Sequence, residues 1–169
     1  MIKIPLQRLR HDSDLEFHFE GSGEKFGFNK VDFPVPDADI QFRLIEVDHG
    51  YFLTGQLTGL AQPECHRCLT QFDYDLNVQM DTLIVLDDSE EFTPEDDIVD
   101  VPGDTQEIDL TDFIQDAIVL ALPVKILCKE DCQGLCAQCG TNLNESSCDC
   151  EKENIDPRWE KLKELNFEE

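Results

Sequence analysis

The chain has 169 residues, of which 13 are Lys or Arg and 38 are Asp or Glu, so its formal net charge is −25. This length allows one hydrophobic core and a small appendage. The acidity disfavours broad contact with nucleic acid and favours a basic partner. No apolar run approaches the roughly 20 residues of a membrane helix. The first residues also lack the apolar core of a secretion signal. We therefore expect a cytoplasmic protein without membrane contact.

Alternating apolar and polar residues predict that the first two-thirds of the chain is mainly β-structure. The alternation is clearest from Phe72 to Met80, and shorter runs include Phe17 and Phe42. A period of two gives each strand one buried and one wet face, as in antiparallel sheets. We therefore expect an α+β fold, with an antiparallel β-rich N-terminal domain over residues 1–125.

One helix is predicted over residues 109–122, packed in the β-rich domain. Its apolar residues follow the helical period, Asp109 is placed to cap it, and Pro123 ends it. Val119 and Leu120 widen the apolar side. This width predicts a helix that is packed on both sides.

An acidic stretch precedes this helix. Residues 87–108 show no sustained period and are predicted to form a loop. The wider range 73–116 contains 16 acidic residues and no Lys or Arg. Such a run is often only a solvated face, but it is also suited to docking a basic protein or mimicking a nucleic acid. Asp73 and Asp75 are our candidate partner-binding residues there.

Eight cysteines carry most of the chemistry of this sequence. Cys65 and Cys68 form a C-x2-C pair, and six more lie between Cys128 and Cys150. Without a secretion signal the compartment is expected to be reducing, which favours metal or redox chemistry over disulfides. Between Cys128 and Asp156 the chain holds few large apolar side chains, mainly Leu135, Leu143 and Ile155. We therefore expect a small cysteine-rich, zinc-binding C-terminal segment over residues 126–169, stabilised by the metal and with a short terminal helix.

Zinc requires four soft ligands at tetrahedral corners, and pairs of closely spaced cysteines supply them. The predicted ligands of a structural zinc ion are Cys136, Cys139, Cys148 and Cys150. In an alternative assignment Cys128 or Cys132 replaces one of the last two, because their spacing is unusually short. A second, less favoured site would use the remaining four cysteines, Cys65, Cys68, Cys128 and Cys132.

No catalytic constellation is evident. The four histidines are scattered and no glycine-rich phosphate loop is present, so we expect neither an enzyme nor a small-molecule substrate. The alternative function is a thiol redox or metal-handling protein. The pattern after Cys65 and Cys68 is that of a strand, whereas a reactive C-x2-C pair usually begins a helix. Thioredoxin-like activity is therefore disfavoured.

Several motifs together resemble those of a known family. They are C-H-R-C-L at residues 65–69, D-L-x3-I-Q-D-x-I-x-L-x-L-P at 109–123, the C-x3-C-x-G-L-C-x2-C-G-x-N-L-N run at 128–144, a C-x-C pair and D-P-R-W. The pattern resembles the YceD-like family of large ribosomal RNA subunit accumulation proteins over about residues 60–165. The resemblance implies a non-catalytic bacterial or plastid factor in ribosome biogenesis.

Two binding mechanisms remain open under this resemblance. In the preferred one, the acidic surface with Asp73 and Asp75 binds a basic ribosomal protein or a large-subunit assembly intermediate. In the other, local basic residues such as Arg67 and Arg158 contact ribosomal RNA, as zinc knuckles often do. The sequence does not decide between them, nor does it indicate an oligomeric state.

Overall fold

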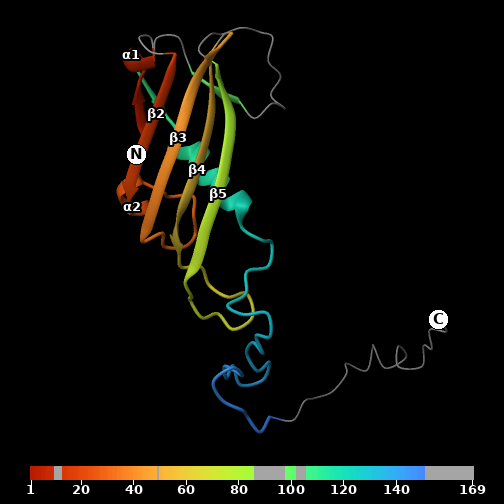
Figure 1. The fold of residues 1–169 in the computed structure, drawn as a ribbon. Coiled ribbons are helices and arrows are strands. Elements are labelled where there is room, and N and C mark those ends of the chain that lie inside the picture. The colour runs from red at the N-terminus through yellow and green to blue at the C-terminus, as the bar shows by residue number, and fades with distance from the viewer. Residues whose placement is uncertain (10–12, 49, 86–97, 102–105, 151–169) are drawn as a thin grey trace, which may run out of the picture.

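A twisted five-stranded sheet forms the body of the protein (Figure 1). The computed structural model describes residues 1–9, 13–48, 50–85, 98–101 and 106–150. The strands, in spatial order, are β2 (Asp14–Gly21), β3 (Asp37–Val47), β4 (Gly50–Ala61), β5 (Tyr74–Val85) and β6 (Ile98–Asp100). The first four pair antiparallel, and β6 pairs parallel with the end of β5. The predicted α+β, mainly antiparallel fold is confirmed.

Each strand buries one face, as the alternation predicted. On β3, Ile40, Phe42 and Leu44 are buried while Gln41 and Arg43 between them are exposed. Buried residues of β4 and β5 extend the same face into one continuous core. Within the described residues no helix or strand packs on the opposite face of the sheet, which we call the open face.

The second layer covers the inner face and comes from the N-terminal part of the chain and from residues 107–121. It consists of β1 (Lys3–Pro5), α1 (Leu6–Leu9), α2 (Gly23–Phe26), β7 (Glu107–Asp109) and α3 (Thr111–Ala121). The short strands β1 and β7 pair antiparallel, and α3 packs against β5, behind the sheet in Figure 1. Fully buried aliphatic side chains from both layers, such as Ile40 of β3 and Ile114 of α3, meet in the core.

Helix α3 confirms the predicted helix but not its predicted packing. The N-cap position is held by Leu110 and not by the predicted Asp109, although Asp109 Oδ1 accepts a hydrogen bond from the Thr111 backbone N–H at 3.0 Å. The helix ends two residues before Pro123. However, Leu120 is 84% exposed and Val119 47% exposed. The prediction of packing on both sides was wrong, because the sheet covers only one side of the helix.

A short strand, β6, lies within residues 87–108, which were predicted to be a loop, and a second one, β7, begins there at Glu107 and ends at Asp109. Each has only three residues, and its backbone groups pair with β5 or β1. The remaining parts of the predicted loop, 86–97 and 102–105, lie outside the described residues. So do the predicted terminal helix and Arg158, within 151–169. In the described part of the chain, no helix has the length and apolar character needed to cross a bilayer.

Candidate metal centres

The loop between β4 and β5 folds into a tight turn that presents two cysteines, and we call residues 64–71 the first knuckle. The Cys65 N–H donates to the Thr70 carbonyl at 3.0 Å, and the Leu69 N–H donates to the Cys65 carbonyl at 2.9 Å. A single β-bridge between Glu64 and Gln71 closes the turn. The turn thereby presents Cys65 and Cys68 from one compact unit.

A second turn over residues 135–142, the second knuckle, repeats this geometry. The Cys136 N–H donates to the Thr141 carbonyl at 2.9 Å, and the Gly140 N–H donates to the Cys136 carbonyl at 2.9 Å. A β-bridge between Leu135 and Asn142 closes it. The two turns share the sequence C-x2-C-x-T, a short repeat that was not identified from the sequence alone.

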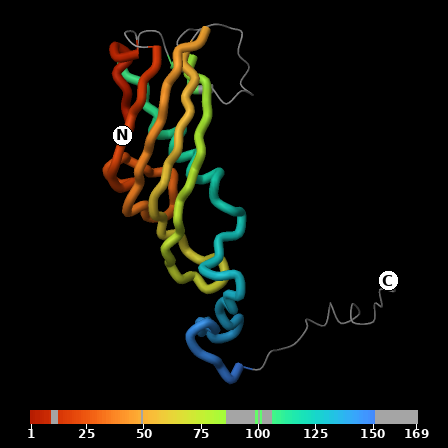
Figure 2. Tube along the Cα trace, viewed as in Figure 1, coloured from red at the N-terminus to blue at the C-terminus, as the bar shows by residue number. Residues whose placement is uncertain are grey.

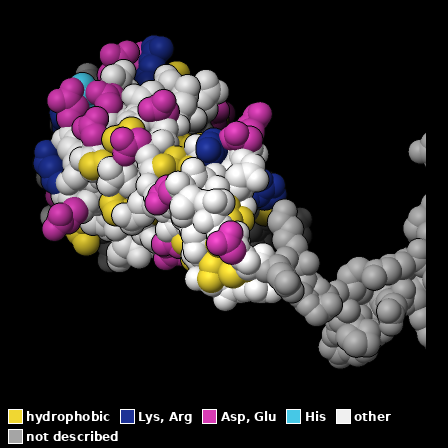
Figure 3. Space-filling view, turned by 90° about the horizontal axis from the view of Figure 1, so that it is seen from below, with side chains coloured by type: hydrophobic (Ala, Val, Ile, Leu, Met, Phe, Trp, Pro, Cys, Tyr) yellow, Lys and Arg dark blue, Asp and Glu magenta, His cyan; other side chains and the backbone are white. Residues whose placement is uncertain are grey.

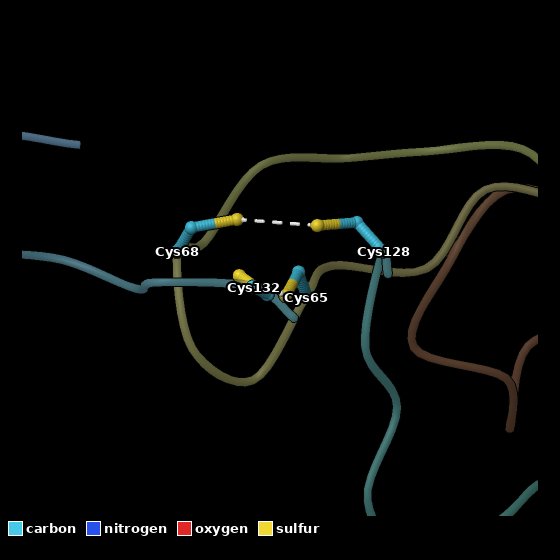
Figure 4. A group of neighbouring side chains, drawn as sticks. All are labelled: Cys65, Cys68, Cys128 and Cys132. Atoms are coloured by element: carbon cyan, nitrogen blue, oxygen red, sulfur yellow. Dashed lines mark hydrogen bonds between the residues drawn. The ribbon is translucent and has the colours of Figure 1, made fainter. Parts of the chain in front are cut away.

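The first knuckle joins Cys128 and Cys132, which lie sixty residues or more further along the chain, in the first candidate centre (Figure 4). The sulfur atoms of Cys65 and Cys132 are 3.8 Å apart, and those of Cys68 and Cys128 are 3.7 Å apart. A tetrahedral Zn–S₄ site with bonds of about 2.3 Å has sulfur–sulfur distances of about 3.8 Å. A disulfide would need about 2.05 Å. The arrangement therefore matches four ligands around an ion.

The second candidate centre consists of the four cysteines favoured by spacing, Cys136, Cys139, Cys148 and Cys150. Their sulfur atoms all lie within 4.8 Å of one another. None of the four is buried, whereas three of the four in the first centre are. Cys128 and Cys132 group with Cys65 and Cys68, so the less favoured partition into two sets of four is the arrangement observed. The alternative in which Cys128 or Cys132 joins the second centre is not.

Arg67 ties the first knuckle to the cysteine-rich segment, which runs beside the β4–β5 loop in Figure 2. Its Nη1 donates to the Cys132 carbonyl at 2.8 Å, and its own carbonyl accepts from the Leu135 N–H at 3.2 Å. Gly134 passes close by with a φ of +74°, and a Cβ there would lie 3.1 Å from the Arg67 carbonyl oxygen. Sequence reasoning assigned Arg67 to a partner, but here it fastens two parts of the chain.

Two asparagines that the sequence analysis did not assign also support the centres. Asn144 Nδ2 lies 3.4 Å from Cys132 Sγ as a donor, and its Oδ1 accepts from the Gln133 N–H at 2.9 Å. Asn142 Nδ2 donates to Thr70 Oγ1 at 3.4 Å, linking the two knuckles. The N-L-N run was the available signal, because amide side chains stabilise thiolates and tight turns.

The thiols of the first centre have pKa values shifted in opposite directions. Burial raises the pKa of Cys65, but hydrogen bonds from the backbone of Cys128, Cys68 and Arg67 outweigh it and lower that pKa to about 6. Burial and hydrogen bonds with the other three thiols raise the pKa of Cys128 to about 12. A divalent cation would remove this opposition by stabilising all four thiolates together.

The second centre shows the same division. Hydrogen bonds from the Thr141 hydroxyl, 3.0 Å away, and from its backbone lower the pKa of Cys139 to about 6. Hydrogen bonding with Cys139, together with burial, raises the pKa of Cys150 to about 12. Each cluster therefore offers four sulfur ligands, and a bound cation would stabilise their thiolate forms.

The other candidate partner residues belong to neither cysteine cluster. Asp73 accepts a hydrogen bond from Gln62 Nε2 at 2.9 Å, and Asp75 is exposed on β5. A third group of possible ligands, His18, Glu20 and Asp39, lies on the open face and is largely exposed. None of its members was predicted as a site residue, and its contacts are those of an ordinary surface ion pair.

The position of the first C-x2-C pair also bears on the redox alternative. Cys65 and Cys68 lie in a turn between two strands and not at a helix N-terminus, where a redox-active C-x2-C pair usually lies. Each of the eight cysteines belongs to one of the two tetrads. This placement favours metal binding over a thioredoxin-like dithiol.

Residues 53–166, which include both knuckles, match the family described as large ribosomal RNA subunit accumulation protein YceD. The chain belongs to the YceD family. An uncharacterized protein of Mycobacterium tuberculosis is 39% identical over 129 residues, which are 75% of this chain and 61% of that protein. An uncharacterized Mycobacterium leprae protein is 34% identical over 75% of this chain and 58% of its own length.

A plant member carries the family's functional name. The chloroplastic YCED homolog 1 of Arabidopsis thaliana, named as a large ribosomal RNA subunit accumulation protein, is 36% identical over 64 residues. That stretch is 38% of this chain and 20% of the plant protein. The chain spans about three-fifths of the length of the M. tuberculosis relative it matches. No solved structure matches.

Proposed function

We propose that this protein is a non-catalytic ribosome biogenesis factor that supports the accumulation of large-subunit ribosomal RNA and carries two structural zinc ions. The observation that carries the proposal is the family match across residues 53–166, which includes all eight cysteines. The name of the plant relative supports the same role.

Zinc is the metal that best fits the two cysteine tetrads. Four thiolates in tetrahedral geometry suit zinc or an iron–sulfur cluster, and in the first centre the sulfur–sulfur distances of 3.7 and 3.8 Å suit a single ion. A structural zinc ion contributes roughly 10–16 kcal/mol to the folding of a small finger at neutral pH. Residues 126–150 bury little apolar surface, with Ile126 and Cys132 as their buried hydrophobic residues. Such a segment therefore depends on metal for its fold.

The charge favours a basic protein over RNA as the direct partner. Acidic side chains are spread over the end of the molecule seen in Figure 3, with fewer Lys and Arg among them. Arg67, one of the proposed RNA contacts, already donates to the Cys132 carbonyl. We infer that a basic ribosomal protein, or an assembly intermediate that contains one, binds the acidic surface that includes Asp73 and Asp75, and that it does so in the cytoplasm.

A gene deletion in the native host tests the proposed function. We expect a fall in the ratio of large-subunit to small-subunit ribosomal RNA, restored by the wild-type gene. A Cys68→Ser, Cys139→Ser double variant should fail to restore it, because both metal centres are lost. An exposed substitution such as Glu20→Gln serves as the control and should restore the ratio. An unchanged RNA ratio in the deletion strain would contradict the proposal.

Zinc exchange and thiol alkylation of the purified, zinc-loaded protein test the redox or metal-handling alternative. Structural zinc should exchange slowly with a zinc indicator and protect all eight thiols from iodoacetamide. Rapid exchange, or one rapidly alkylated thiol in the zinc-loaded protein, would favour the alternative function.

A further inference from the structure

Strand β5 is paired along only a short part of its outer edge. Its inner neighbour β4 pairs with it from Tyr74 to Val85, whereas β6 pairs only with Leu83–Val85. Among the described residues, no strand lies beside residues 74–81 on that side. Unpaired backbone groups on such an edge can form hydrogen bonds with an added strand.

A groove of about 520 Å³ lies beside this edge, between β5 and α3. Its apolar lining includes Val78, Met80, Phe113, Ala117 and Leu120. Leu120 stands on its rim and is 84% exposed. A large apolar side chain beside an unpaired edge is the arrangement used when a peptide docks by adding a strand.

The two faces of an added strand would meet different surroundings. Side chains of a strand alternate between faces, so every second one would point toward α3 and pack in the groove. The others would lie on the open face beside the exposed residues of β5, which include Asp75 and Asp81. Cross-strand pairs of opposite charge are favourable.

The acidic residues Asp75 and Asp81 determine which charge the groove favours in a bound segment. No Lys or Arg of the described residues forms an ion pair with Asp75 or Asp81. Asp116, in the groove lining, shares Lys30 with Asp112, at 3.5 and 3.3 Å. A segment that brings Lys or Arg to this edge would complement Asp75 and Asp81, while an acidic segment or an RNA backbone would be repelled.

We propose that the groove between β5 and α3 docks an extended, basic segment of a partner protein, which adds to the edge of β5 as a strand. Its apolar side chains contact Phe113 and Leu120, and its Lys or Arg side chains lie beside Asp81. This docking site deepens the proposed function, on which it rests for the choice of a basic protein partner.

A labelled ten-residue peptide of alternating Lys and Val is the probe, used with the full-length, zinc-loaded protein. Fluorescence anisotropy should show saturable binding. The same peptide with alternate backbone nitrogens methylated keeps its charge but loses the N–H groups needed for strand pairing. It should bind at least tenfold more weakly. Equal binding of the two peptides would overturn the proposal, because it would show that only charge is recognised.

Matched variants place the binding site on the protein. Leu120→Lys should weaken peptide binding at least tenfold, while Val124→Lys, at a residue 99% exposed outside the groove lining, should change it less than threefold. Asp81→Lys should weaken binding tenfold, whereas Glu20→Lys, the same charge change on the opposite edge strand, should have a smaller effect. Equal losses within either pair would overturn the proposal.

Three other occupants give distinct results, and each would overturn it. If the chain's own terminal segment fills the groove, Leu120→Lys will change the fluorescence emission of Trp159, the single tryptophan, and Val124→Lys will not. If a second copy fills it, sedimentation will show a dimer that Leu120→Lys dissociates. If RNA fills it, a single-stranded RNA oligonucleotide will bind and Leu120→Lys will abolish that binding. A failure in the groove experiments leaves the RNA ratio of the deletion strain unaffected, so the two proposals fail separately.

Discussion

Leu69 occupies in the first knuckle the position that Gly140 occupies in the second, and both residues have a positive φ, 58° and 72°. Glycine adopts this left-handed conformation without strain, whereas a leucine there carries a cost of about 1–2 kcal/mol. The Leu69 side chain is 58% exposed, so burial offsets little of that cost. The hydrogen bonds of the turn and the anchored cysteines hold the leucine in this conformation.

Substitutions at these two positions should therefore have opposite effects. Leu69→Gly should stabilise the first centre by about 1 kcal/mol, because it relieves the strained backbone and loses little packing. Gly140→Ala should weaken the second centre by a similar amount, since no atom lies within 4 Å of an added Cβ and only the backbone cost remains. Zinc affinity at each centre, measured by chelator competition, should change about fivefold. Changes of the same sign at both positions would contradict this explanation.

The parts of the fold with strong local patterns could be predicted from sequence. Strand β5 and helix α3 were predictable because each carries several apolar residues at its own period. The three-residue strands β6 and β7 could not be, since their pairing with distant strands, and not their composition, defines them. Leu120 was misjudged because periodicity shows that a residue is apolar, but not whether a second surface covers it.

The two candidate centres also differ in how far the sequence could predict them. The cluster from Cys136 to Cys150 lies within 15 residues, so spacing favoured this grouping, although it left open that Cys128 or Cys132 replaces one of the last two cysteines. The first centre unites Cys65 with Cys132 across 67 residues, and only the antiparallel return of β5 and the end of α3 bring these segments together. The fastening role of Arg67 was equally invisible, because its acceptor is a backbone carbonyl.

The two centres should bind one zinc ion each and lose it at different rates. Metal analysis should give two zinc ions per chain, and one in either Cys68→Ser or Cys139→Ser. The second centre should release its zinc first under a strong chelator, because none of its cysteines is buried. After full removal, residues 126–150 should become protease-sensitive while the circular dichroism of the sheet persists. A chain that binds no zinc, or unchanged protease resistance of this segment, would refute the metal centres.

Arg67 should act on the first centre and not the second. Arg67→Ala removes the donor to the Cys132 carbonyl and should weaken the first centre by about 1 kcal/mol. Its zinc should then be released several times faster, while the release rate of the second zinc stays the same. Lys129→Ala, at a neighbouring exposed cation, is the control and should change neither rate. An Arg67→Ala protein with unchanged zinc release but a lost partner would restore the original assignment of Arg67 to partner binding.

His18 on the open face should titrate above its ordinary value of 6.5. The hydrogen bond to Asp39, with Nε2 and Oδ2 2.8 Å apart, raises the pKa of His18, and Glu20 adds to the effect. The pair therefore contributes stability below pH 6.5, and this contribution is lost as the pH rises through the folded-state pKa. NMR titration should show a lower His18 pKa in Asp39→Asn, and no comparable change in Asp14→Asn. An unaltered pKa in Asp39→Asn would exclude this contact in solution.

Gln115 should be the most sensitive polar residue of the core. It is fully buried on α3, and its Oε1 accepts from the backbone N–H groups of Asn29 and Lys30 at 2.5 and 2.7 Å. Gln115→Ala would remove the acceptor of both partly buried hydrogen bonds, at about 0.5–1.5 kcal/mol for each. We therefore expect a loss of about 2 kcal/mol in urea unfolding, together with faster amide exchange at Asn29 and Lys30. Gln41→Ala, on the open face, should cost no more than about 0.5 kcal/mol. Equal losses in the two variants would show that the loop before β3 is held by packing and not by this side chain.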